Sequence, residues 1–152
     1  MSSLQRLSSR LRLGLGDWRE VERVGLDELA KGHSEAEVVS LASVTTSTDQ
    51  LVDLVDAAVR ARGDEVPDDV AAAQLVAREV AQEIVDLSVA PLAGARTLWQ
   101  LARQVPAIEP DLRIFIGLAS EWDDDAASRR AYEADIVSAA RELVSSAGQK
   151  EE

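Results

Sequence analysis

Residues 67–89, PDDVAAAQLVAREVAQEIVDLSV, contain the clearest helical pattern in the chain. Pro67 is suited to the first turn of a helix, and the acids after it favour the positive end of the helix dipole. On a wheel of 3.6 residues per turn, small aliphatic side chains fill one half and polar side chains the other. The apolar half holds Val70, Ala73, Val76, Ala77, Val80, Ala81, Ile84 and Leu87. The polar half holds Gln74, Arg78, Glu79, Gln82, Glu83 and Asp86.

Upstream of this helix, polar residues and glycines predict where shorter helices start and stop. Asp17 is placed to cap a helix, and Ser34 followed by Glu37 has the pattern of a capping box. Thr48 is expected to cap a further helix, which Gly63 would end. The first half of the chain therefore predicts three short helices with brief connections.

Downstream, prolines divide the chain. Pro91 opens one predicted helix. Residues 110–122, PDLRIFIGLASEW, then predict a helix buried nearly all round, although RIFIG at 113–117 could instead be a buried strand. Helix is favoured because no second strand-like segment is available to pair with it. The last helix is expected over residues 126–147, with Asp125 as its N-cap and Gly148 as its stop.

The predicted fold class is all-α. The hydrophobic residues, 46% of 152, are mostly Ala, Val and Leu, with only three Trp, one Tyr and one Phe, which favours packed helices over strands. No long linker or internal repeat divides the chain. We therefore expect a single-domain bundle of six to seven helices with short loops. Its parts are a basic, flexible N-terminal arm (1–16), the helical domain (17–148) and a frayed tail (149–152).

The composition limits the classes of ligand. With 28 acidic and 16 basic residues, the net charge is −12, and the resulting field repels phosphate backbones. We therefore expect no nucleic acid partner. The absence of cysteine excludes disulfides, thiolate metal sites and cysteine nucleophiles.

The N-terminal segment is the one basic stretch. Arg6, Arg10 and Arg12 precede any acid, and three leucines among them share a helical face. Three positive charges make a weak membrane anchor, so a helix lying on the protein's own acidic body is favoured over a membrane-binding arm. No apolar run approaches the roughly 20 residues of a membrane span, and the start lacks a secretory signal pattern. We expect a cytoplasmic protein without stable membrane association.

The densest acidic cluster lies in ASEWDDD, residues 119–125. A calcium loop would need a glycine at its tight turn and a closing glutamate, and both are missing. One aspartate suffices to cap the next helix, and the other acids would favour its positive end. So many like charges repel unless Arg129, Arg130 or a basic partner neutralises them. The candidate partner-binding residues are Glu121, Trp122, Asp123, Asp124 and Asp125.

No catalytic residue or cofactor is predicted. Glu79, Glu83 and Asp86 share one side of a helix and could hold Mg²⁺, a spacing similar to that of helical nucleotide pyrophosphohydrolases. Those enzymes also take acids from a facing helix, and no matching pair is found; a solvated helix face is the ordinary alternative. His33, expected in the turn before Ser34, would need a carboxylate or serine partner to act as a general base.

The second half of the chain carries a resemblance. Residues 112–144, LRIFIGLASEWDDDAASRRAYEADIVSAARELV, resemble the C-terminal part of small acidic helical proteins of bacteria, some of them grouped with toxin-immunity proteins. Residues 84–102, IVDLSVAPLAGARTLWQLA, fit the same pattern. The resemblance carries no catalytic signature.

Three functions follow as hypotheses. The first is a non-enzymatic immunity or inhibitor protein whose acidic surface binds a basic partner such as a nuclease toxin. The second is a magnesium hydrolase of the helical nucleotide pyrophosphohydrolase type. The third is a helical adaptor that assembles as a homo-oligomer through Leu75 and Val85, two apolar residues on the polar half of their helix.

Overall fold

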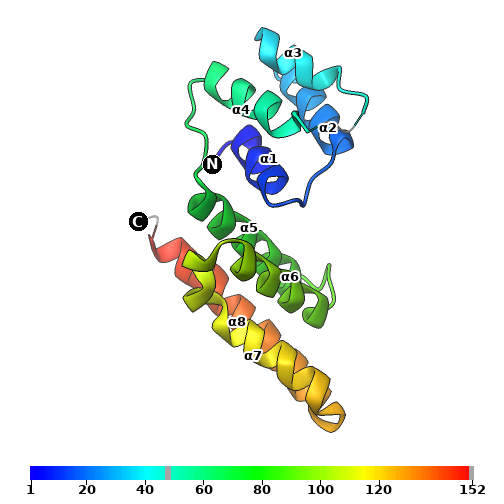
Figure 1. Ribbon diagram of the computed structural model, residues 1–152, viewed down its shortest axis with the longest axis vertical. Coiled ribbons are helices and arrows are strands. Elements are labelled where there is room, and N and C mark those ends of the chain that lie inside the picture. Colours follow the sequence, from blue (N-terminus) through cyan, green and yellow to red (C-terminus); the bar gives the residue numbers. More distant parts are fainter. Residues whose placement is uncertain (47–48, 151–152) are drawn as a thin grey trace. The chain divides into compact units, whose positions relative to one another are not determined.

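The computed structural model describes residues 1–46 and 49–150. These residues form eight α-helices and two short 3-10 helices without any strand (Figure 1), so the predicted all-α class is confirmed, with slightly more helices than expected. Contacts within the chain gather into two compact units, Met1–Ala72 and Ala73–Glu152, here called unit 1 and unit 2. Within the described residues, no helix combines the length and apolarity that crossing a membrane requires.

Unit 1 is a cluster of short helices around an aliphatic core. The helices are α1 (Ser3–Arg12), α2 (Trp18–Ala30), α3 (Ala36–Ala42) and α4 (Leu51–Ala61). Residues 1–16, expected as an arm outside the helical domain, contain α1, which packs against α4 and α2. Leu4 and Leu7 of α1 are 2% and 1% exposed and lie in the same core as Val21, Leu41 and Val55. The leucine face of this segment therefore packs within unit 1.

Two of the predicted helix ends in unit 1 are confirmed. The Asp17 carboxylate accepts a hydrogen bond from the backbone N–H of Glu20 at 3.1 Å and caps α2. Gly63 follows α4 with a φ of 80°, a left-handed conformation that glycine adopts without strain.

The capping box predicted at Ser34 is wrong. Helix α3 begins at Ala36 with Glu35 as its N-cap, and no side chain caps it. Because the helix starts one residue later than the box requires, the Ser34 hydroxyl lies too far out to reach the N–H groups of the first turn. The expected cap at Thr48 lies outside the described residues.

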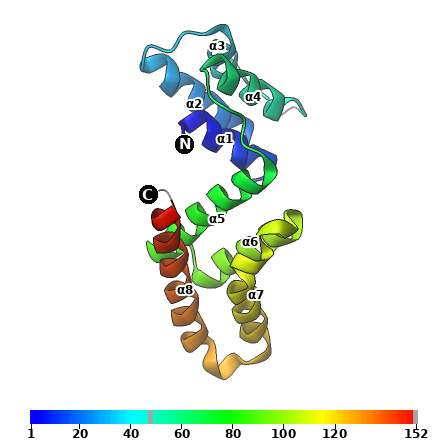
Figure 2. The ribbon, with the colours of Figure 1, turned by 90° about the vertical axis from the view of Figure 1, so that its left-hand side faces the viewer.

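Unit 2 contains most of α5 (Asp69–Val85), followed by α6 (Pro91–Gln104), the 3-10 helix η1 (Pro106–Ile108), α7 (Glu109–Asp124), the 3-10 helix η2 (Ala126–Ser128) and α8 (Arg129–Lys150). Helix α6 packs along α7, and α7 and α8 meet at the turn that contains η2. Figure 2 shows α7 and α8 diverging from this turn.

Helix α5 differs from its prediction at both ends. Asp68 caps its first turn by accepting from the backbone N–H of Ala71 at 2.7 Å, so Pro67 precedes the cap. Val70 and Leu87, both assigned to the buried half, are 39% and 69% exposed. Leu87 lies beyond the helix with a φ of 57°, so the helical wheel no longer applies to it. The central apolar positions, Ala73 to Ile84, are buried as predicted.

The apolar segment at 112–118 is part of α7, so helix was the correct choice over strand. It is not buried all round, however, because Ile114 is 52% exposed while Leu112 and Phe115 are 1% exposed. The neighbouring helices cover one side of α7 and leave the other in solvent. The last helix, α8, also runs through Gly148 to Lys150, so the predicted stop there is wrong.

Candidate functional site

The four acids of the cluster and Trp122 lie at the corner between α7 and α8, as the sequence predicted. They belong to the end of α7, however, and not to the start of the next helix. Asp123 and Asp124 belong to the last turn of α7, and Asp125 follows as the C-cap of that helix. The expected position was the positive end of the next helix. A helix C-terminus instead carries partial negative charge, where carboxylates are unfavourable by about 0.3–1 kcal/mol each.

One of these charges has a basic partner from another helix. Arg96 of α6 donates from Nη2 to Oδ1 of Asp123 at 2.8 Å, and both side chains are about half exposed. Arg129 has a different role from the predicted one: its Nε donates to the backbone oxygen of Trp122 at 3.3 Å, and its guanidinium lies 5.3 Å from the centre of the Trp122 ring. Within the described residues, neither Arg129 nor Arg130 forms a salt bridge with the aspartates.

Asp125 has a local structural role. Its side chain accepts from the backbone N–H of Ala127 at 3.1 Å, which caps η2, and from the Tyr132 hydroxyl at 3.1 Å. A hydrogen bond from the Ser128 side chain, followed by that from Tyr132, lowers the pKa of Asp125. The same Asp125–Tyr132 hydrogen bond raises the pKa of the Tyr132 phenol. The predicted capping role of Asp125 is confirmed, although the cap belongs to η2.

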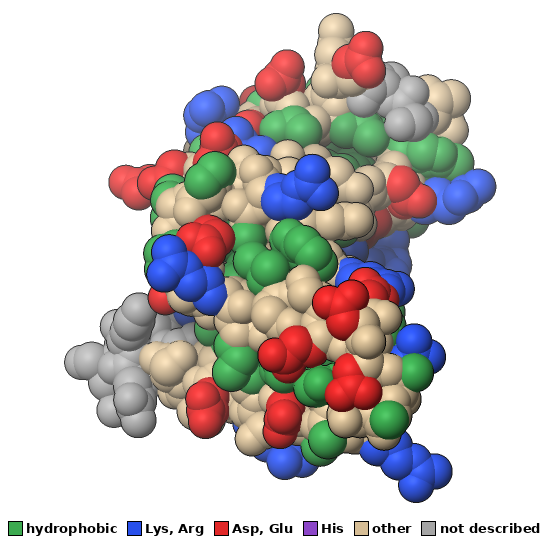
Figure 3. Space-filling view, turned by 60° about the horizontal axis from the view of Figure 1, so that its bottom comes forward, with side chains coloured by type: hydrophobic (Ala, Val, Ile, Leu, Met, Phe, Trp, Pro, Cys, Tyr) green, Lys and Arg blue, Asp and Glu red, His purple; other side chains and the backbone are tan. Residues whose placement is uncertain are grey.

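Glu121 and Asp124 are the two acids of this corner that have no partner among the described residues. Both side chains are exposed, and neither forms a salt bridge or hydrogen bond with any residue that the structure describes. Trp122 between them is half-buried. Figure 3 shows Asp and Glu side chains gathered over unit 2, with apolar side chains exposed among them. The corner thus has two unpaired negative charges, among the described residues, beside a half-buried aromatic ring.

The runner-up metal residues are not assembled into a site. Glu79 and Glu83 are half-buried on α5. Asp86 is exposed one residue beyond the end of that helix, where its side chain accepts a hydrogen bond from Gln82 at 3.0 Å. In the part of the chain that the structure describes, no three carboxylate or imidazole groups are placed to hold one metal ion.

His33 lies in the turn before Ser34, as predicted, and the fold does place a carboxylate beside it. Its Nε2 is 3.6 Å from Oε2 of the buried Glu28, while Arg62 Nη1 contacts Nδ1. Arg62 also lies 3.4 Å from Oε1 of Glu35. Both imidazole nitrogens therefore face charged neighbours within unit 1, an arrangement that ties α2, the following turn and α4 together.

The N-terminal arginines pair with acids of unit 1. Arg10 Nε lies 2.8 Å from Oε1 of Glu20, and Arg12 Nη2 lies 2.7 Å from Oδ2 of Asp56. These ion pairs match the favoured expectation of a basic helix lying on the protein's own acidic body.

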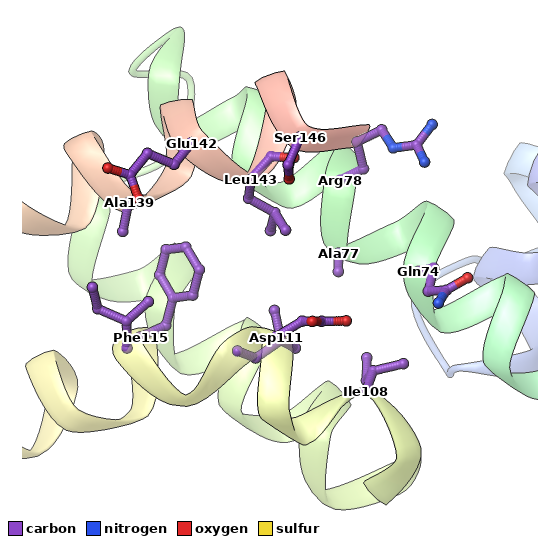
Figure 4. Close-up of a pocket in the computed structure, with 12 residues that line it drawn as sticks. Gln74, Ala77, Arg78, Ile108, Asp111, Phe115, Ala139, Glu142, Leu143 and Ser146 are labelled. Atoms are coloured by element: carbon purple, nitrogen blue, oxygen red, sulfur yellow. The ribbon is translucent and has the colours of Figure 1, made fainter. Parts of the chain in front are cut away.

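A pocket of about 440 Å³ lies between α5, α7 and α8 of unit 2, a site that the sequence had not indicated (Figure 4). Its apolar lining comes from Ala77, Ile108, Leu112, Ile114, Phe115, Ala139 and Leu143. Asp111 of α7 and Glu142 of α8 contribute carboxylates, and Figure 4 shows the Arg78 guanidinium pointing away from the space.

The pattern behind this pocket was present in the sequence. Ile108, the N-cap of α7, and residues 111, 112 and 115 of that helix line it at i, i+3, i+4 and i+7. Residues 139, 142, 143 and 146 of α8 repeat that spacing. The α7 residues were part of the segment predicted to be buried nearly all round, because a helical stripe has the same spacing whether it faces a packed neighbour or a pocket.

The chain matches no protein-family model, and neither a curated protein nor a solved structure is detectably similar to it. The resemblance of residues 112–144 to small acidic immunity-type proteins therefore stays a prediction.

Proposed function

We propose that this chain is a non-enzymatic acidic binding protein, an immunity or inhibitor protein that docks a basic partner such as a nuclease toxin. The observation that carries the proposal is the charge at the α7–α8 corner. Glu121, Asp123 and Asp124 lie together in the last turns of α7. Among the residues that the structure describes, only Asp123 of these three is paired with a cation, Arg96.

The unfavourable placement of these acids supports a role in binding. A cap requires one aspartate, and Asp125 fills that role at η2. Asp123 and Asp124 lie at the negative end of α7, where the helix dipole opposes their charge. Lysines or arginines of a partner would supply the missing positive charge, and the complementary fields would speed the encounter.

The partner should therefore contact the exposed acids and the neighbouring indole ring together. Trp122 is half-buried, and the Arg129 guanidinium lies 5.3 Å from the centre of its ring, the kind of contact by which an aromatic face attracts a cation. A basic surface with one or more arginines fits this combination of carboxylates and an aromatic face.

The magnesium hydrolase and the homo-oligomeric adaptor have less support. Glu79, Glu83 and Asp86 do not converge with other described ligands. Leu75 and Val85, the positions suggested for self-assembly, are half-buried and offer little apolar surface. No observation favours either function over binding.

The proposal is tested by affinity capture from a lysate of the native host. The corner variant replaces Glu121→Gln, Asp123→Asn and Asp124→Asn, leaving Asp125 to cap η2. The control variant replaces Asp27→Asn, Glu37→Gln and Asp53→Asn, three exposed acids of unit 1. Both variants lose the same total charge, so the comparison isolates the position of the acids.

We expect the wild type and the control to retain one basic protein that the corner variant loses, with capture falling as salt rises. The captured protein is then purified and its affinity for each variant measured by calorimetry. The proposal would be contradicted if the corner variant captured the same proteins as the wild type and the control variant.

A further inference from the structure

We propose that the α5/α7/α8 pocket of unit 2 receives an apolar side chain from a helix of the basic partner, with lysine or arginine on both sides of that side chain. This inference rests on the proposed function and specifies the part of the partner that is recognised. It names a second contact, separate from the acidic corner.

The lining of the pocket is suited to an apolar group. Phe115 and Leu143 point toward one another across the space in Figure 4, with Ala77 and Ala139 beside them. The pocket volume of about 440 Å³ falls within the range of roughly 300–1,000 Å³ typical of ligand pockets. Small alanine side chains on α5 and α8 leave this room where larger residues would fill it.

The charged side chains at the pocket favour a positively charged ligand. Asp111 on α7 and Glu142 on α8 are both exposed, and within the described residues neither forms a salt bridge or hydrogen bond. They occupy matching positions, each one residue before an apolar lining residue, Leu112 or Leu143. An apolar group that enters the pocket thus has a carboxylate on either side.

A helix with basic residues flanking its apolar face matches this arrangement. Apolar anchors of an amphipathic helix commonly enter hydrophobic grooves between helices. An anionic ligand would meet repulsion from both carboxylates and from the net charge of the chain, −12. The proposed function already requires a basic partner. The carboxylates beside the pocket and its apolar lining therefore both fit a basic amphipathic helix of that partner.

The test uses three labelled synthetic peptides of equal length and the full chain. The first has leucines at helical i, i+3, i+4 spacing and lysines elsewhere; the second has alanine for each leucine; the third has glutamate for each lysine. Fluorescence anisotropy at low salt gives the affinity of each. We expect the leucine–lysine peptide to bind about tenfold tighter than the alanine–lysine peptide, and the glutamate peptide not to bind.

Adjacent serines of α8 supply a matched pair of variants. Both are exposed, but Ser146 lines the pocket whereas Ser145 does not. Ser146→Trp should fill the space and weaken the leucine–lysine peptide about tenfold, while Ser145→Trp should leave its affinity within about twofold. Asp111→Asn combined with Glu142→Gln should weaken both lysine peptides about fivefold.

The outcomes separate the two proposals. Equal affinity of the leucine–lysine and alanine–lysine peptides, no effect of Ser146→Trp, or no binding of any peptide at millimolar concentration overturns the pocket proposal. Capture of the host partner by the Ser146→Trp variant with unchanged affinity also overturns it and leaves the proposed function intact. Loss of corner dependence in the lysate experiment overturns the proposed function regardless of the peptide result.

Discussion

Asp56 is a buried carboxylate that connects α4 to the first helix of the chain. Its side chain is 9% exposed; Ser8 Oγ donates to Oδ1 at 2.6 Å, and Arg12 Nη2 donates to Oδ2 at 2.7 Å. Removing one member of a buried ion pair leaves the other charge without compensation, which costs more than the pair itself contributes. This cluster is therefore expected to fix α1 against α4.

We predict that Asp56→Ala lowers the free energy of unfolding by about 2–3 kcal/mol, somewhat less than for a fully buried pair because Arg12 is one-quarter exposed. The control is Asp53→Ala on the same helix, an exposed acid whose loss should change stability by no more than about 0.5 kcal/mol. Urea unfolding followed by circular dichroism measures both. Equal effects of the two substitutions would show that the buried cluster has no special role.

Asp125 provides a prediction about pH. Hydrogen bonds from Ser128 and Tyr132 lower its folded-state pKa, so its contribution to stability is fully present above the unfolded pKa of about 3.9 and is lost as pH falls through the lower folded value. For Tyr132 the folded pKa is raised, so its contribution is present below about pH 10 and lost as pH rises through the folded value.

These shifts should be visible residue by residue. Carboxyl carbon NMR should place the Asp125 pKa below that of an unfolded peptide. Ser128→Ala should raise it more than Tyr132→Phe, because the serine hydrogen bond is the larger cause. An unchanged Asp125 titration in both variants would mean that neither hydroxyl holds the carboxylate in solution.

At the scale of elements, two helical glycines should respond in opposite directions to the same substitution. A Cβ added at Gly25 of α2 would lie 2.5 Å from the backbone nitrogen of Ala42 and 2.8 Å from the carbonyl carbon of Leu41, so α2 and α3 would have to separate. A Cβ added at Gly117 of α7 meets no atom within 4 Å.

Gly25→Ala should therefore destabilise the protein by about 1–3 kcal/mol, as expected for overpacking. Gly117→Ala should stabilise it by about 0.5–1 kcal/mol, because alanine is the better helix former and loses less backbone entropy. Thermal unfolding of the two variants beside the wild type measures the difference. Stabilisation by Gly25→Ala would mean that α2 and α3 do not approach so closely.

Helix positions were predictable from the sequence where the deciding interactions are local. Asp17 and Gly63 act on their own helix ends, and Pro91 begins α6 as its fixed φ favours. The helix boundaries predicted at Ser34 and Gly148 were wrong, because such a residue shows only that a helix is able to start or stop there. Packing decides between the permitted boundaries.

The candidate site was predictable only in part for the same reason. The acids of the corner are neighbours in sequence, so their clustering was visible. The pairing of Asp123 with Arg96 joins residues 27 positions apart, and the pocket joins stripes from three helices. No local pattern specifies such contacts, since they depend on how the helices pack.

At the scale of the whole molecule, the charge is evenly divided. Residues 1–72 and 73–152 each contain 14 acidic and 8 basic residues, a net charge of −6 apiece. Two copies of the chain therefore offer each other no oppositely charged unit, and self-association would have to overcome repulsion through apolar contact alone. A basic partner meets attraction from either unit.

We predict that the chain is a monomer of 16.4 kDa by light scattering at pH 7.5 in low salt, across about 10–200 µM, because like-charged copies repel. Self-association should increase as pH approaches the isoelectric point near 4.5, where the repulsion vanishes. The variant Leu75→Gln with Val85→Gln serves as the control, since it removes the apolar residues that an adaptor assembly would use. A stable oligomer at pH 7.5 that this variant dissociates would favour the adaptor function over the binding protein proposed above.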